Sequence, residues 1–90
     1  MIDKLIDVGI DGHRRIVFYL DGTYKIFVHD EVDSTSWWTI DEDNKMHYKH
    51  YVDDEWQVWP SWNKDENYIH IEEQVRWALF SRELEKDVLT

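Results

Sequence analysis

The chain has 90 residues, enough for one domain with a core of its own and too few for two. Twenty Asp and Glu residues outnumber ten Lys and Arg residues, giving a formal net charge of −10. This balance argues against direct binding to nucleic acid or to an anionic membrane, because both require a basic surface. Cysteine is absent, which excludes disulfides, thiolate metal sites and a thiol nucleophile.

Residues 1–10 fit two structures equally well. Three apolar residues at one-turn spacing, followed by Gly9, suit a short helix, whereas a stretch this short also suits an edge strand. The three apolar residues are Ile2, Leu5 and Ile6.

Two runs of β-branched and aromatic residues, 15–20 and 23–28, flank the dipeptide of Asp21 and Gly22. A two-residue Asp-Gly loop is typical of a hairpin closed by a type I′ turn. Such a loop predicts three cross-strand pairs: Tyr19 with Tyr24, Val17 with Ile26, and Arg15 with Val28. Both faces of this hairpin are largely apolar, so we expect both to be covered, or the sheet to close into a barrel.

Three further strands are predicted at 36–40, 46–52 and 56–59, after a polar connector at 30–34. Short connections between them favour an antiparallel meander over residues 13–59. Residues 71–86 contain neither Gly nor Pro and are predicted to form a helix. We therefore expect a single α+β domain over 1–90: a five-stranded antiparallel β-meander, twisted or partly closed, with a C-terminal helix packed on it.

The predicted helix has two apolar stripes. The first is expected to pack on the sheet and consists of Ile71, Val75, Ala78 and Leu79. The second lies roughly opposite and consists of Trp77, Phe80, Leu84 and Val88. The second stripe must be covered by the N-terminal segment, by a second copy of the chain in a homodimer, or by a partner.

Acidic residues cluster between the predicted strands. The clusters are Asp30, Glu31 and Asp33; Asp41, Glu42 and Asp43; and Asp53, Asp54 and Glu55. Asp is a turn former, so one interpretation is purely structural. The other interpretation is a negative surface that binds a basic one. Acidic residues outnumber basic ones two to one, and the repulsion among them destabilises the chain without helping it to fold.

Six tryptophans are a second compositional anomaly. Trp37 and Trp38 are adjacent and must face opposite sides of a strand, so at least one lies outside a one-sided core. Filling a small core is one interpretation, and an exposed binding patch is the other. The aromatic residues predicted to bind a partner are Trp37, Trp56, Trp59 and Trp62.

Catalytic and metal-binding patterns are weak. The loop that starts at Asp41 has Lys45 at the third ligand position of an EF-hand, which excludes that motif. His47 and His50 are three apart in a predicted strand and cannot share an ion, although His13 and His29 could approach each other at strand ends. No serine has a nucleophile-elbow context. We expect no catalytic residues, no metal, no cofactor and no enzyme activity.

In size, acidity, absence of cysteine and aromatic-rich strands, the whole chain resembles the small inhibitor proteins that bacteriophages encode against host machinery. These include anti-CRISPR and anti-restriction proteins, some of which imitate the charge of DNA. The resemblance implies a non-enzymatic protein that occupies the basic groove of a nucleic-acid-binding target in the host cytoplasm.

The expected function is therefore an acidic binding or inhibitor protein that engages a basic, nucleic-acid-binding protein through acidic loops and exposed aromatics. It would bind no nucleic acid directly and no membrane. No apolar run is long enough for a membrane span or a signal peptide, so a cytoplasmic location is expected. The alternative is a carbohydrate or small-ligand module that uses Trp56, Trp59 and Trp62 as stacking platforms.

Overall fold

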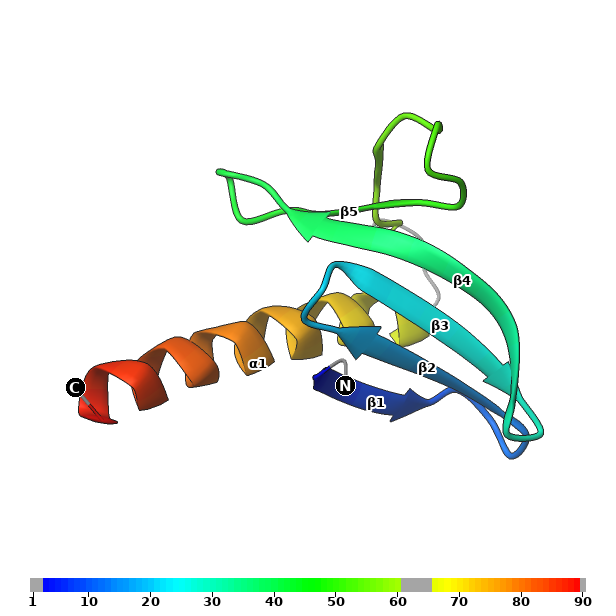
Figure 1. Cartoon of the computed structure of the whole chain (residues 1–90), viewed down its shortest axis with the longest axis horizontal. Coiled ribbons are helices and arrows are strands. Elements are labelled where there is room, and N and C mark those ends of the chain that lie inside the picture. The colour runs from blue at the N-terminus through cyan, green and yellow to red at the C-terminus, as the bar shows by residue number, and fades with distance from the viewer. Residues whose placement is uncertain (1–2, 61–65, 90) are drawn as a thin grey trace.

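The chain folds into one antiparallel sheet followed by a long helix (Figure 1). The computed structural model describes residues 3–60 and 66–89, and the side chains of residues 3–60 and 70–82. The elements are β1 (Lys4–Gly9), β2 (Arg14–Tyr19), β3 (Thr23–Val28), β4 (Glu31–Ile40), β5 (Met46–Lys49), β6 (Gln57–Val58) and α1 (Glu66–Leu89). Each strand pairs with the next along the chain, in the order β1 to β6.

The predicted α+β class, with an antiparallel meander and a C-terminal helix, is confirmed. The sheet has six strands instead of five because residues 4–9 form the edge strand β1, which decides between the two structures expected there. The sheet is open and does not close into a barrel. The helix is also longer than the predicted range of 71–86.

The first hairpin has a different register from the predicted one. Phe18 lies opposite Tyr24 and Ile16 opposite Ile26, because the loop between β2 and β3 contains residues 20–22 and not two residues. Gly22 has a φ of 91° and donates its amide to the carbonyl of Tyr19 at 3.2 Å. This geometry is typical of a three-residue hairpin loop, in which a tight turn is followed by a residue, here Gly22, in the left-handed conformation. The predicted pairs Tyr19 with Tyr24, Val17 with Ile26 and Arg15 with Val28 are therefore wrong. The one-residue shift in register moves the side chains of β2 to the opposite face relative to those of β3.

The type I′ geometry occurs at the next turn instead. His29 and Asp30 both have positive φ, 50° and 66°, and Val28 pairs with Glu31 across them. The prediction of a polar connector at 30–34 is wrong, because β4 begins at Glu31 and includes most of that stretch. A bulge near Ile26 absorbs the extra residue of β4.

The inner face of the sheet, which faces α1, carries the core. Its buried residues are Ile16, Phe18, Tyr24, Trp38, Met46 and Trp59 from the sheet side, and Ile71 and Val75 from α1. Phe18 is fully buried, with its ring centroid 5.1 Å from Tyr24, 5.9 Å from Trp38 and 6.0 Å from Trp59. Ala78 and Leu79 are half-buried, so the predicted core stripe of the helix is confirmed.

In the described part of the chain, α1 lies on the inner side of the sheet and no helix lies over the outer face (Figure 1). Cationic side chains lie over its rings instead: the Arg15 guanidinium is 5.7 Å from the Phe27 centroid, and the Lys25 ammonium is 5.6 Å from that of Tyr19. Val17, on the same face, is only 1% exposed. Of the two expected solutions, closure into a barrel is wrong, because the sheet is open. Among the described residues, long cationic side chains lie across the outer face.

Candidate functional site

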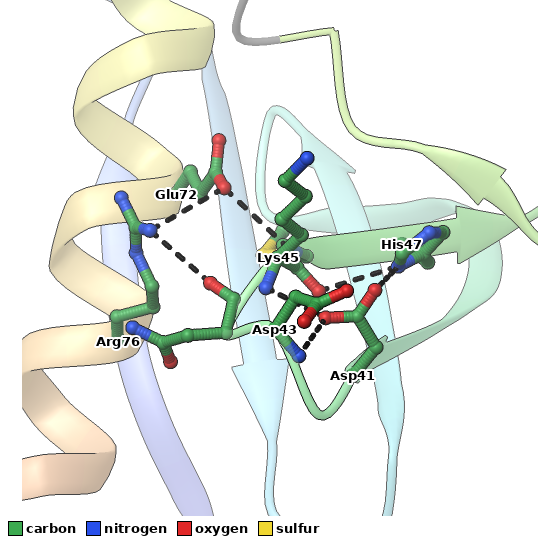
Figure 2. A network of polar contacts seen from close by, with 8 residues as sticks. Asp41, Asp43, Lys45, His47, Glu72 and Arg76 are labelled. Atoms are coloured by element: carbon green, nitrogen blue, oxygen red, sulfur yellow. Dashed lines mark hydrogen bonds and ion pairs between the residues drawn. The ribbon is translucent and has the colours of Figure 1, made fainter.

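Hydrogen bonds with α1 hold the hairpin between β4 and β5 against the helix (Figure 2). Glu72 is 7% exposed and accepts a hydrogen bond from the Met46 amide at 3.5 Å. Arg76 Nη1 lies 3.8 Å from the Glu72 carboxylate and donates to the Asn44 carbonyl at 3.2 Å. A buried carboxylate is costly unless it is paired and hydrogen-bonded, and here it has both partners. The tip of the hairpin is therefore held beside α1.

At that tip, Asp41 has a structural role. Its Oδ1 accepts the amides of Asp43 and Lys45, both at 2.9 Å, and Asn44 adopts a left-handed φ of 64°. Glu42 and Asp43 are exposed, and their side chains form no hydrogen bond or ion pair with another described residue. The turn-former interpretation thus holds for Asp41, whereas the other two acids of its cluster project from the tip without a structural role.

The helix exposes two large aromatic residues next to this hairpin. Trp77 is 69% exposed and Phe80 is 50% exposed, and their rings stack with centroids 5.7 Å apart. They border a hollow of about 590 Å³, which we call the helix–hairpin groove. Its lining residues are Ile40, Asn44, Glu73, Arg76, Trp77, Leu79 and Phe80. Their exposure shows that the described part of the N-terminal segment, residues 3–10, leaves these two rings largely uncovered.

The other acidic clusters lie elsewhere. Asp30, Glu31 and Asp33 are exposed where β4 begins, and the ten residues of that strand put them about 30 Å from its far end at roughly 3.3 Å per residue. Because connections in a meander alternate ends, the cluster of Asp53, Asp54 and Glu55 also lies away from the hairpin tip. Asp54 accepts the Tyr51 amide at 3.1 Å, another turn-forming role. Of these three clusters, the one at 41–43 adjoins the helix–hairpin groove, because the next residue, Asn44, lines it.

The predicted aromatic set is divided between faces. Trp38 is 7% exposed on the inner face and Trp37 is half-buried on the outer face, as their adjacency predicted. Trp56 is 44% exposed, with the Lys49 ammonium 4.5 Å from its centroid. The prediction that Trp59 is an exposed binding residue is wrong, because Trp59 is 3% exposed and its amide donates to the Met46 carbonyl at 2.9 Å.

Three predicted site residues cannot be placed. Trp62 and the side chains of Leu84 and Val88 lie outside the described residues. Of the three tryptophans proposed as stacking platforms, Trp56 is therefore the one that the described part of the chain exposes.

The ends of β2 and β3 bring two histidines together, as expected. The rings of His13 and His29 stack with centroids 5.3 Å apart. Beside them, the backbone amide of His13 and the side chain of Arg14 hold the pKa of the Asp11 carboxyl at about 2. Within residues 3–60 and 66–89, no group of three or more potential ligand side chains is arranged to hold a metal ion.

A second hollow, the inner pocket, was not predicted from the sequence. Its volume is about 400 Å³, and its lining residues are Ile10, Arg14, Ile16, Tyr24, Ile26, Tyr48, His50, Trp59, Pro60 and Ile71. The predicted register placed Ile16 on the opposite face from Tyr24 and Ile26. The observed register places all three on the inner face, so the correct turn type was the signal that could have revealed this pocket.

Comparisons with protein families, with curated proteins and with solved structures find no match. In the part of the chain that the structure describes, no helix has both the length and the apolar character needed to cross a bilayer. Chemically, the helix–hairpin groove combines stacked rings with acidic neighbours, which suits aliphatic and cationic side chains of another molecule.

Proposed function

We propose that this chain is a non-enzymatic binding protein that engages a basic protein surface through the helix–hairpin groove. The observation that carries the proposal is the exposure of Trp77 and Phe80, stacked on each other beside a hollow. Fully burying a large apolar side chain is worth about 1.5–3 kcal/mol, and the fold leaves this gain unused. Aromatic anchors beside a pocket are typical of the residues that dominate the affinity of protein interfaces.

Charge supports a basic partner. Glu42, Asp43 and Glu73 are exposed around the groove, whereas the nearby Arg76 is engaged with Glu72 and Asn44. Acids at the rim accelerate encounter with Lys and Arg side chains and make binding sensitive to salt. The face of an indole ring also attracts cations. The acidic residues would thus raise the association rate and select basic partners, whereas the rings of Trp77 and Phe80 would supply most of the binding affinity.

The partner class follows from the same chemistry. Proteins that bind nucleic acid carry the most concentrated basic surfaces, so they fit an acidic, aromatic groove best. The compositional resemblance to phage inhibitors of host machinery supports the same class. In this proposal the protein binds no nucleic acid itself and acts in the cytoplasm, that of the host if a phage encodes it.

Comparative capture from lysate of the source cell tests the proposal. Wild type is compared with W77A/F80A, with E42K/D43K, and with D53K/E55K, which changes the net charge by the same amount away from the groove. We expect a basic, nucleic-acid-binding protein that the first two variants lose and D53K/E55K retains. Equal capture by all four proteins would refute the proposed surface. So would a homodimer that W77A/F80A dissociates, since a second copy would then occupy the groove.

A further inference from the structure

We infer that the inner pocket binds a small molecule that joins a ring-sized apolar body to a carboxylate. The pocket is separate from the helix–hairpin groove, and the two share no lining residue. Its volume of about 400 Å³ lies within the range of small-molecule sites, roughly 300–1,000 Å³.

The walls of the pocket are apolar and aromatic. Ile16 and Ile26 lie opposite each other on β2 and β3, and Ile71 of α1 is 3% exposed in the same core cluster. Tyr48 and Trp59 meet edge to face with centroids 5.5 Å apart. Rigid aromatic and branched side chains line a cavity that cannot collapse without loss of packing, so an apolar body gains contact when it enters.

Arg14 supplies the polar recognition. Its Nε and Nη2 donate to Asp11 Oδ2, at 2.8 and 2.7 Å, and this contact orients the guanidinium. A guanidinium has five N–H donors, so three remain, and no other described residue takes them. A planar fork of N–H groups matches a carboxylate better than any other common anion-binding side chain does.

The other polar groups at the pocket are compatible with a ligand that carries a carboxylate. Arg14 is the permanently charged residue in the pocket lining, and Asp11, which offsets part of its charge, lies outside that lining. His50 also lines the pocket, and its Nδ1 lies 3.4 Å from Ser36 Oγ, which leaves Nε2 for a ligand. A cationic ligand would meet the guanidinium at short range, which disfavours amines.

The test uses two probes of nearly the same shape, naphthalene-2-carboxylate and its neutral amide. Each is titrated into isotope-labelled protein while the indole N–H signals are followed by NMR. We expect a saturable shift of the Trp59 signal with the carboxylate and about fivefold weaker binding of the amide, as expected for loss of one charge-assisted contact at a partly exposed site. The Trp77 signal, which reports on the helix–hairpin groove, should stay in place.

Two adjacent arginines provide a matched control. Arg14→Gln should remove the preference for the carboxylate over the amide, whereas Arg15→Gln, on the outer face, should retain it. Ile26→Phe fills the pocket and should weaken both probes. The inference is overturned if neither probe shifts Trp59, if the two probes bind equally to wild type, or if Arg14→Gln and Arg15→Gln behave alike. W77A/F80A should bind the carboxylate normally, so failure of the proposed function would leave this result unchanged.

Discussion

Replacing Trp38 by phenylalanine should strongly destabilise the fold. The Trp38 indole N–H donates to the carbonyls of Tyr19 and Thr23, both at 3.0 Å, and these residues flank the loop between β2 and β3. The Trp38 backbone amide also donates to the Gly22 carbonyl at 2.9 Å. A side chain and an amide of β4 thus hold the loop that sets the register of the first hairpin. Phenylalanine keeps most of the ring and removes the N–H.

The magnitude follows from burial. Trp38 is 7% exposed, and its N–H bonds to two partly buried carbonyls. The Tyr19 carbonyl keeps the Gly22 amide, so the loss falls mainly on the Thr23 carbonyl, and a poorly solvated acceptor that loses its donor costs about 1–3 kcal/mol. The smaller ring loses roughly another 1 kcal/mol of apolar burial. The total of about 2–4 kcal/mol is a large share of the roughly 5–13 kcal/mol expected for a domain of this length. It should lower the melting temperature by about 10–25 °C.

Urea unfolding followed by circular dichroism measures this cost. The matched control is Trp37→Phe, one residue away on the outer face, where the ring is half-buried and makes no hydrogen bond to a described residue. We expect a loss below about 1 kcal/mol there. If Trp38→Phe were as mild as Trp37→Phe, the role of the indole N–H in holding the hairpin loop would be refuted.

Three further predictions concern single sites. Asp11→Asn should be less stable than wild type above about pH 4, because the folded-state pKa of Asp11 is lowered to about 2 from its ordinary value of 3.8. Urea unfolding measured across pH should show this stability difference vanish as the pH falls through 2, and a difference that stays constant would contradict the prediction. Asp30→Gly should gain about 0.5 kcal/mol in urea unfolding, because glycine tolerates a φ of 66° better, and a loss would contradict this. Val75→Ala should lower the free energy of unfolding by about 2 kcal/mol in the same assay, because Val75 is fully buried. Trp77→Ala should lower it far less, because Trp77 is exposed, and equal losses would contradict the assignment of the two helix faces.

Local chemistry predicted the elements of this fold. β-branched and aromatic runs indicated strands around residues 14–19 and 23–28, and the absence of Gly and Pro indicated the helix. The core stripe through Ile71 and Val75 and the opposite orientation of Trp37 and Trp38 followed from periodicity alone. These features depend on neighbours in sequence, which is why the sequence suffices for them.

Register and site depended on information outside any short window. An Asp-Gly pair fits a two-residue or a three-residue loop, and the Trp38 contacts to Tyr19 and Thr23 that accompany the longer loop come from a strand far along the chain. The helix–hairpin groove lies where Arg76 donates to the Asn44 carbonyl, a contact between residues 32 apart in the sequence. The periodicity of the two segments does not predict that contact. The second apolar stripe was therefore predicted, but the acidic hairpin beside its Trp77 and Phe80 was not.

Binding of a defined basic peptide tests the central claim most directly. The probe is a fluorescent amphipathic peptide with Leu and Lys at helical spacing, titrated against wild type, W77A/F80A, E42K/D43K and D53K/E55K at physiological salt. The account predicts that the first two variants bind at least about tenfold more weakly, as expected for loss of hot-spot residues and their acidic rim, while D53K/E55K stays within about twofold of wild type. Equal affinity of all four proteins, or equal losses in E42K/D43K and D53K/E55K, would contradict it.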